Sequence, residues 1–371
     1  MYGFLTKPTL RSAFLVALVV VGAASCASTP SGSSTGKGGA PGSGGTSSAG
    51  GSKSSGGAQG AGGMQDTGDV PVKNDAPPAD TAAPKDAQGR AFDGGIRARQ
   101  ITTRGFTFDV LESGSAGEPV LLLHGFPDTS LEWSGLMPVL SAAGYHCLAP
   151  DQRGYSPGAR PTEVGAYKYE ELVADAFAIG SELGERFHLV GHDWGANVGW
   201  LMLQKDPSRI ASFTAISIPH YQVWARSVYD DPKMAGYLWM LSDWMTEGKG
   251  ESVWTAPQMK RMWKAKPADL REATIAHMTE PGAITAALNW YRASRGHKRV
   301  IEEFEVWKVD VPTLLIHGSA DLGERSLKDT EPLMTGPYRV ARPTGGHFIV
   351  DEQPKAVADE TLAHLRAYPI K

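Results

Sequence analysis

Cysteine is scarce in this sequence, which has Cys26 and Cys147 as its 2 cysteines among 371 residues. Their surroundings differ so much that they do not indicate a disulfide framework. Cys147 falls in the short apolar run 146–150, so we expect it to be a small buried side chain. A nucleophilic or metal-binding role, which would need an activated thiolate, is not expected for it.

An excess of basic residues is also missing. The chain has 36 Lys and Arg against 40 Asp and Glu, a net charge of −4, with no basic stripe along the sequence. Proteins that bind nucleic acids present a basic surface to the phosphates, so nucleic acid is excluded as a partner. No cluster of metal-ligand residues stands out either, and neither a metal ion nor an organic cofactor is expected.

The apolar run near the N-terminus is too short for a confident membrane span. Residues 13–24 follow Lys7 and Arg11 and have the length of a signal peptide. The run ends Ala23-Ala24-Ser25-Cys26, which resembles a bacterial lipoprotein cleavage box, although alanine stands at 23 where leucine is usual.

We therefore expect residues 1–26 to be a signal peptide of lipoprotein type, with lipid attached to Cys26. The protein would then be exported and anchored to a membrane of the cell envelope. The alternative is ordinary signal-peptide cleavage near Ala27, in which case Cys26 is incidental.

Residues 27–96 contain very few apolar side chains beyond alanine. The segment is rich in Gly and Ser and, later, in Pro and Asp. Such a composition cannot bury enough surface to offset chain entropy. We predict a disordered tether that joins the lipid anchor to a folded domain of residues 97–371.

The folded part has the pattern of an α/β protein. Residues 101–110 alternate as in an antiparallel hairpin. Continuous apolar runs at 120–123, 187–190 and 313–316 predict strands that are buried on both faces, as in a parallel sheet. Between them, residues 169–183 have helical spacing. This alternation predicts a doubly wound, mostly parallel sheet.

The alternation stops at Pro219 and resumes near Val311. The intervening sequence is rich in Trp, Met and helix-forming residues and lacks strong strand signals. Because the sheet pattern continues afterwards, we interpret residues 220–297 as a helical cap inserted into the sheet domain.

One short motif carries chemistry. The segment Gly191-His192-Asp193-Trp194-Gly195 follows an apolar strand and opens a helical segment. It has the form of a nucleophile elbow, Gly-x-nucleophile-x-Gly, in which a sharp turn lifts the central side chain above the sheet. Taken alone, Asp193 could instead be a helix cap. The partners of Asp193 elsewhere in the sequence favour its role as a nucleophile.

Other segments supply partners for this nucleophile. His347 lies after the last predicted strand and before the C-terminal helix, where a fold with such an elbow places its base. Asp321 follows the strand that ends at Ile316 and can orient this histidine, with Glu324 as the reserve candidate. An oxyanion hole is expected from the backbone N–H groups of Trp194 and of Phe126, which lies in the loop after an earlier strand.

These segments together resemble the α/β-hydrolase superfamily, in the branch of epoxide hydrolases and haloalkane dehalogenases. The resemblance covers residues 98–371 and is carried by HGFPDT at 124–129, DQRGYSPGARP at 151–161, GHDWGAN at 191–197, LNWYRA at 288–293 and GGHF at 345–348. It implies a pair of cap tyrosines that act as acid or hydrogen-bond donor. Tyr291 matches the second of them, and Tyr237 is our choice for the first, with Tyr229 and Tyr221 nearby.

An aspartate nucleophile fits hydrolysis at an alkyl carbon. A carboxylate that attacks such a carbon forms an ester, which water can then cleave, whereas serine would form a stable ether. We therefore expect Asp193 to open an epoxide, and His347 with Asp321 to activate the hydrolytic water that releases a diol. The expected substrate is small and apolar.

Two alternatives stay open at this point. A haloalkane dehalogenase would use the same nucleophile, with Trp239 or Trp244 as a halide ligand. Many dehalogenases have asparagine where this chain has Phe126. The second alternative is a surface ligand-binding protein of the same fold that has lost activity.

Overall fold

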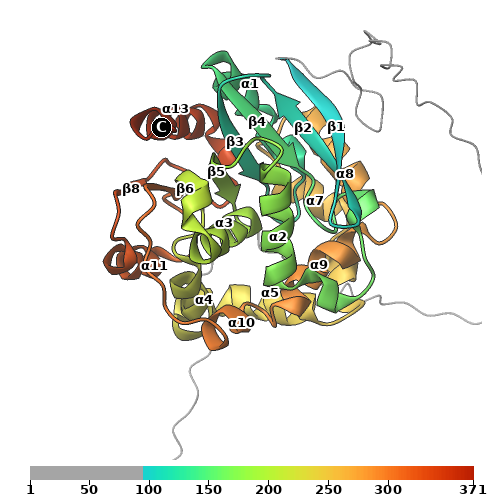
Figure 1. Ribbon diagram of the computed structural model, residues 1–371. Helices are drawn as coiled ribbons and strands as arrows, with labels where there is room; N and C mark the ends of the chain where they lie inside the picture. Colours follow the sequence, from blue (N-terminus) through green and yellow to red (C-terminus); the bar gives the residue numbers. More distant parts are fainter. Residues whose placement is uncertain (1–94) are drawn as a thin grey trace, which may run out of the picture. The chain divides into compact units, whose positions relative to one another are not determined.

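The computed structural model describes residues 95–371 (Figure 1). The expected signal peptide, Cys26 and the expected tether up to residue 94 lie outside the described residues. The first strand begins at Ile96, one residue before the expected start of the folded part. Within the described part, no helix has both the length and the apolar character needed to cross a membrane.

A single sheet organises residues 95–371. Its strand order is β1-β2-β4-β3-β5-β6-β7-β8. The first two strands form an antiparallel hairpin, β2 is antiparallel to β4, and from β4 to β8 all neighbours are parallel. The strands are β1 (Ile96–Thr103), β2 (Phe106–Ser113), β3 (Glu118–Leu123), β4 (Tyr145–Pro150), β5 (Phe187–His192), β6 (Ile210–Ile216), β7 (Thr313–Ile316) and β8 (Tyr338–Ala341). The predicted hairpin and parallel sheet are confirmed.

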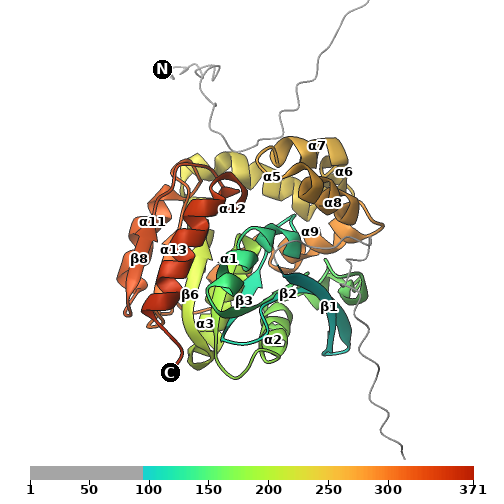
Figure 2. The ribbon, with the colours of Figure 1, turned by 90° about the horizontal axis from the view of Figure 1, so that it is seen from above.

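Helices cover both faces of the sheet, which explains the continuous apolar runs. Side chains alternate along a strand, so Leu121 and Leu123 of β3 join the cluster that contains α2 (Tyr169–Gly180) and α3 (Trp194–Lys205). Val120 and Leu122 join the opposite cluster. There they meet α1 (Met137–Ala142) and α13 (Pro354–Ala367), which lie side by side in Figure 2.

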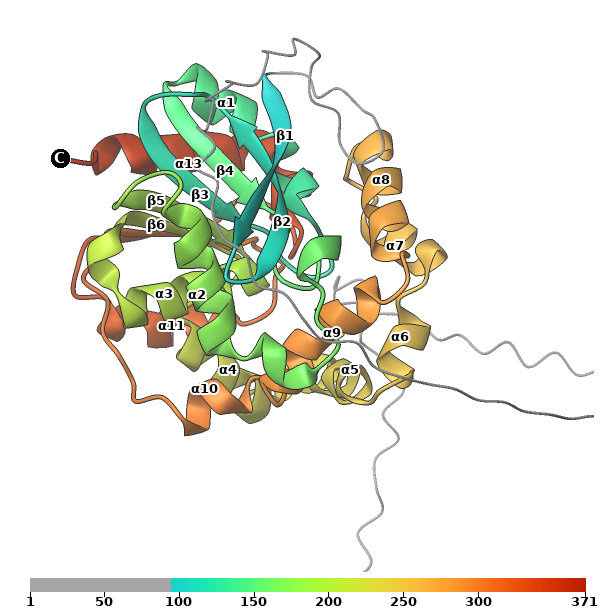
Figure 3. The ribbon, with the colours of Figure 1, turned by 45° about the vertical axis from the view of Figure 1, so that its right-hand side comes forward.

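The cap is a run of helices between β6 and β7, and in Figure 3 it extends from α10 and α4 at the bottom to α7 and α8 on the right. Its helices are α4 (Tyr221–Asp230), α5 (Ala235–Met245), α6 (Lys249–Val253), α7 (Ala256–Met262), α8 (Ala268–Met278), α9 (Ala283–Ala293) and α10 (Lys298–Glu302). The helical insertion therefore extends past residue 297, through α10. Side chains of α5 and α9 share one apolar cluster with Phe126 and Trp194 of the sheet domain, so the cap packs directly over the predicted site.

Short elements complete the chain. They are η1 (Ser130–Ser134), η2 (Pro157–Ala159), η3 (Val164–Tyr167), η4 (Pro207–Arg209), η5 (Pro232–Met234), α11 (Glu324–Thr330), η6 (Glu331–Leu333) and α12 (Ile349–Glu352). Cys147 of β4 is fully buried as an unpaired thiol, and burial raises its pKa to about 12. A thiol with such a pKa stays protonated and unreactive.

Candidate active site

The turn between β5 and α3 holds Asp193 in a conformation that non-glycine residues rarely adopt. Its φ is +47° and its ψ is −115°. Gly191 and Gly195 make this turn possible: a Cβ on Gly195 would overlap the carbonyl oxygen of Leu123, and one on Gly191 would lie 2.5 Å from the carbonyl oxygen of Gly195. The strained turn therefore lifts the side chain of Asp193 off the carboxyl end of β5, although the residue stays buried.

His347 lies between two carboxylates. Its Nε2 is 3.4 Å from Oδ2 of Asp193, and its Nδ1 is 3.2 Å from both carboxylate oxygens of Asp321. The reserve candidate Glu324 is elsewhere, since its side chain is 59% exposed and pairs with Arg342 at 2.6 Å. The structure thus brings Asp193, His347 and Asp321 together and leaves Glu324 apart.

The other oxygen of Asp193 meets the expected oxyanion hole. The backbone N–H of Phe126 donates to Oδ1 of Asp193 at 2.8 Å. Trp194 is the first residue of α3, where backbone N–H groups have no acceptor within the helix. The two carboxylate oxygens of Asp193 therefore have different partners. Oδ1 accepts a hydrogen bond from the N–H of Phe126, and Oδ2 lies toward His347.

Electrostatics favours charged groups at this centre. Burial opposes the imidazolium form of His347, but the carboxylates of Asp321 and Asp193 outweigh it and raise the pKa of His347 well above its ordinary value. Burial likewise opposes the carboxylate of Asp193, yet His347 and His192 outweigh it and lower the pKa of Asp193. The resting site is an ion-paired aspartate–imidazolium–aspartate.

An apolar cavity of about 850 Å³, counting its open mouth, lies between the cap and the nucleophile. Asp193, His347, Tyr237 of α5 and Tyr291 of α9 all line it. The remaining wall is mostly aromatic or thioether and includes Phe126, Trp224, Met240, Trp244, Trp254, Met262 and Phe348. Burial raises the pKa of both tyrosines well above 10, so each is a neutral phenol that the cap contributes to the cavity wall.

The other tyrosines and tryptophans of the cap are placed differently. The hydroxyl of Tyr229 donates to the carbonyl oxygen of Gly296. Tyr221 is fully buried, with its hydroxyl 2.8 Å from that of Tyr169. Trp239 is 59% exposed, so it is not placed to hold a halide, whereas Trp244 lines the cavity.

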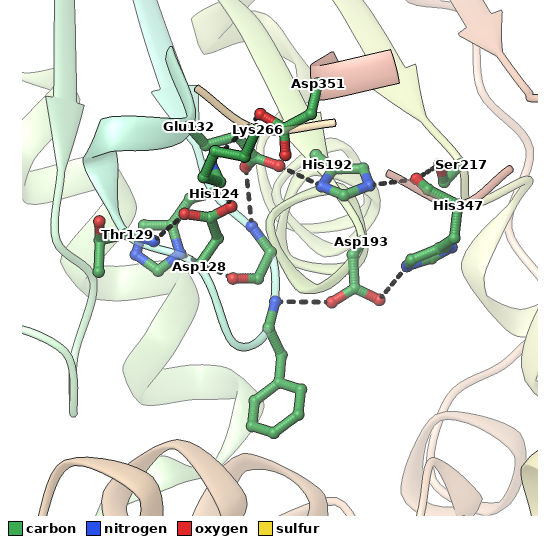
Figure 4. A network of polar contacts seen from close by, with 12 residues as sticks. His124, Asp128, Thr129, Glu132, His192, Asp193, Ser217, Lys266, His347 and Asp351 are labelled. Carbon is green, nitrogen blue, oxygen red and sulfur yellow. Dashed lines mark hydrogen bonds and ion pairs between the residues drawn. The ribbon is translucent and has the colours of Figure 1, made fainter. Parts of the chain in front are cut away.

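Beside the nucleophile lies a buried ionic cluster that the sequence did not predict (Figure 4). Lys266, from the cap segment between α7 and α8, is 2% exposed. Its Nζ is 2.9 Å from Oδ2 of Asp128 and 3.3 Å from Oδ1 of Asp351. Burial raises the pKa of each of these carboxyls, an effect that Lys266 opposes. No sequence pattern marks Lys266, because its partners lie far away along the chain.

His192 connects this cluster with the base. Its Nδ1 is 2.5 Å from Oε1 of Glu132 in η1, and its Nε2 is 2.9 Å from the backbone carbonyl oxygen of His347. A carbonyl only accepts hydrogen bonds, so Nε2 carries a hydrogen. Burial opposes the charge, but Glu132 raises the pKa of His192. Glu132 thus favours the charged form of His192, which supports the backbone of the base through Nε2–H. The place of His192 inside the elbow motif was the available signal.

Comparison with known proteins agrees with this geometry. The family model described as alpha/beta hydrolase fold matches residues 118–241. The crystal structure of Epoxide Hydrolase A from Mycobacterium thermoresistibile superimposes with a TM-score of 0.62 at 26% identity, covering 74% of this chain and 100% of that one. Fold and site together define the class of protein, an α/β-hydrolase.

Two similar proteins indicate the branch of the α/β-hydrolases to which this chain belongs. Epoxide hydrolase 3 of Siraitia grosvenorii is 38% identical over 316 residues, covering 72% of this chain and 96% of that protein. Epoxide hydrolase A of Mycobacterium tuberculosis is 29% identical, covering 74% of this chain and 98% of that protein. The chain belongs to the epoxide hydrolase branch of the α/β-hydrolase superfamily, which confirms the resemblance noted in the sequence.

Proposed function

We propose that this protein hydrolyses epoxides of small apolar molecules to vicinal diols through an ester on Asp193. The observation that carries the proposal is the cavity itself. It has a carboxylate nucleophile with a histidine base on one wall and two buried neutral phenols on the other. The relatives are named as epoxide hydrolases, in agreement with this chemistry.

The first half-reaction is ring opening. Oδ2 of Asp193, the oxygen that does not accept from Phe126, attacks an epoxide carbon and the ring C–O bond breaks. The oxygen that is released takes a proton from Tyr237 or Tyr291, leaving a phenolate, while Asp193 becomes a neutral ester. An alkoxide is a poor leaving group, so this proton donor is essential.

The second half-reaction is ester hydrolysis. Because Asp193 is now neutral, His347 first returns its proton to the phenolate. Its neutral Nε2 then takes a proton from water, and the hydroxide attacks the carboxyl carbon of Asp193. The N–H groups of Phe126 and Trp194 stabilise the oxyanion that forms on Oδ1. Collapse passes the proton of the attacking hydroxyl to the departing oxygen, which releases the diol and restores the carboxylate of Asp193. His347 keeps the proton that it took from water, so the resting ion pair is restored.

The test is a panel of epoxides and haloalkanes, with diol and halide measured separately. We expect diol from apolar epoxides without release of halide from haloalkanes. Halide release without diol formation would instead support the dehalogenase, and no turnover of either class would support an inactive ligand-binding protein.

Isotope labelling tests the intermediate. In a single turnover in heavy-oxygen water, wild-type enzyme should give diol without label, because the new oxygen comes from Asp193. Label in the diol after one turnover would mean that water attacks the epoxide directly and that Asp193 is not the nucleophile.

We further propose that the protein is exported and held at a membrane by lipid on Cys26. The support is the Ala23-Ala24-Ser25-Cys26 segment after an apolar run. Cys26→Ala should abolish acylation and release the protein from membranes. Wild-type protein without lipid mass on its N-terminus would contradict the anchor and leave the enzymatic proposal unaffected.

A further inference from the structure

A buried histidine at the end of the cap contacts one of the two cavity tyrosines. His297 precedes α10, is 1% exposed and has a φ of +72°. Its Nε2 is 3.0 Å from the hydroxyl of Tyr237, and its Nδ1 is 2.9 Å from the hydroxyl of Tyr221. The hydroxyl of Tyr221 in turn lies 2.8 Å from that of Tyr169. A chain of hydrogen bonds therefore runs from the cavity at Tyr237 into the core.

His297 is neutral in this setting. Burial lowers its pKa to about 3, and Asp193 offsets this only in part. Its ring lies nearly parallel to that of Trp194, with an interplanar angle of 28° and 5.0 Å between centroids. A neutral imidazole has one nitrogen that donates and one that accepts. The hydrogen bonds from Tyr237 through His297 to Tyr221 can therefore all point in one direction or all in the opposite one.

In the first direction, Tyr237 donates to Nε2 of His297. Its proton then points away from the cavity. In the second direction, Nε2–H donates to Tyr237, Tyr221 donates to Nδ1, and Tyr169 donates to Tyr221. Only the second direction leaves the hydroxyl hydrogen of Tyr237 free for a substrate oxygen.

The second direction also suits the charge that develops during ring opening. Proton transfer leaves a phenolate on Tyr237, inside a cavity whose wall is mostly apolar. An N–H donor to a buried anion forms a strong, charge-assisted hydrogen bond. Tyr291 has no such contact with His297 beyond ring packing, with 5.6 Å between centroids.

We infer that His297 is a positioning residue for ring opening: its Nε2–H turns the hydroxyl hydrogen of Tyr237 into the cavity and holds the resulting phenolate. The inference rests on the proposed function. It also assigns the two tyrosines unequal roles. Tyr237 transfers the proton, and Tyr291 assists as a hydrogen-bond donor to the same oxygen.

The test compares His297→Leu with His297→Gln, which place side chains of similar size at the same positive φ. Only glutamine keeps an N–H donor within reach of Tyr237. Single-turnover kinetics should resolve formation of the ester on Asp193 from its hydrolysis. We expect His297→Leu to slow ester formation by about tenfold or more and to leave ester hydrolysis nearly unchanged, and His297→Gln to recover most of the rate.

A double-mutant cycle separates this role from packing. In a Tyr237→Phe background, His297→Leu should cause no further slowing, because His297 acts through Tyr237. The same slowing in that background, or equal slowing of both half-reactions, would overturn the inference. A wild-type enzyme that forms no ester would overturn the proposed function as well, whereas a wild-type ester with unaltered formation in His297→Leu would overturn only the inference.

Discussion

His347 must change its protonation state during the proposed reaction. In the resting site it lies between Asp193 and Asp321, and these carboxylates raise its pKa well above the ordinary value. A base must be neutral, however. Ester formation removes the charge of Asp193, so one of the two anions that hold the proton on His347 disappears. The first half-reaction thereby prepares His347 to act as the base of the second.

Replacing His347 with glutamine should trap the intermediate. His347→Gln retains the backbone carbonyl that contacts His192 but removes the base, so ring opening should proceed and ester hydrolysis should stop. Intact-protein mass should rise by the mass of the epoxide, with the adduct on the peptide that contains Asp193. An adduct on another peptide would mean that the nucleophile is misassigned.

Asp193→Asn imitates the neutral ester and should lower the pKa of His347. Because the wild-type pKa is raised by two carboxylates, the variant should lose its imidazolium proton at lower pH than wild type. A titration of nitrogen-15-labelled histidine by NMR measures this directly. Asp321→Asn is the matched control, since it removes the other carboxylate and should also lower the pKa. A pKa that does not change in Asp193→Asn would contradict the proposed change in charge.

At the scale of elements, the β5–α3 turn depends on the close approach of α3 to β3. A Cβ on Gly195 would overlap the carbonyl of Leu123 at the end of β3, and β3 is paired on both sides in the sheet. The strand therefore has little freedom to move away. The position of Asp193 is thus fixed by β3, by its neighbours β4 and β5, and by α3, rather than by the turn alone.

Gly195→Ala should lower the free energy of unfolding by about 1–3 kcal/mol through overpacking and should also displace Asp193 and reduce turnover. Gly165→Ala is the control, because a Cβ there meets nothing within 4 Å. It should change stability by less than about 0.5 kcal/mol. Urea unfolding and initial rates measure both effects. Wild-type stability and turnover in Gly195→Ala would contradict the steric account.

At the scale of the whole described domain, Lys266 ties the cap to the sheet domain through Asp128 and Asp351. Both carboxyls are largely buried, so the lysine offsets part of the penalty of burying them. The cluster lies beside the Glu132–His192 pair that supports the base (Figure 4). The position of the cap and that of the catalytic histidine are therefore linked through adjoining buried charges.

Lys266→Met should lower the free energy of unfolding by about 3–5 kcal/mol near neutral pH, because it leaves buried carboxylates without a counter-ion. The loss should shrink as pH falls, since Asp128 and Asp351, whose pKa values burial already raises, then take up protons. Lys260→Met is the control, as its pair with Glu272 is exposed at 57% and 51%, and it should cost less than about 1 kcal/mol. Equal effects of the two variants in urea unfolding would contradict the buried-cluster account.

Local patterns in the sequence determined much of the fold. The runs at 120–123, 187–190 and 313–316 became β3, β5 and β7, and the helical spacing of 169–183 became α2. Their apolar periodicity is a property of neighbouring residues and is readable without tertiary contacts. β4, β6 and β8 were not predicted as strands. β4 is short and ends in proline, β6 buries Ser212 and Thr214 among its apolar residues, and β8 is four residues long and partly exposed.

The sequence also predicted the nucleophile Asp193, the oxyanion-hole residue Phe126 and the base His347. Each of these residues lies in a short motif that follows a strand. Only the tertiary structure decided between Asp321 and Glu324, which are equally acidic and almost adjacent, since the choice depends on which carboxyl faces His347. Lys266 and His297 belong to no local motif. Their partners lie on other elements and meet them only when the cap packs on the sheet, so their roles follow from packing rather than from sequence pattern.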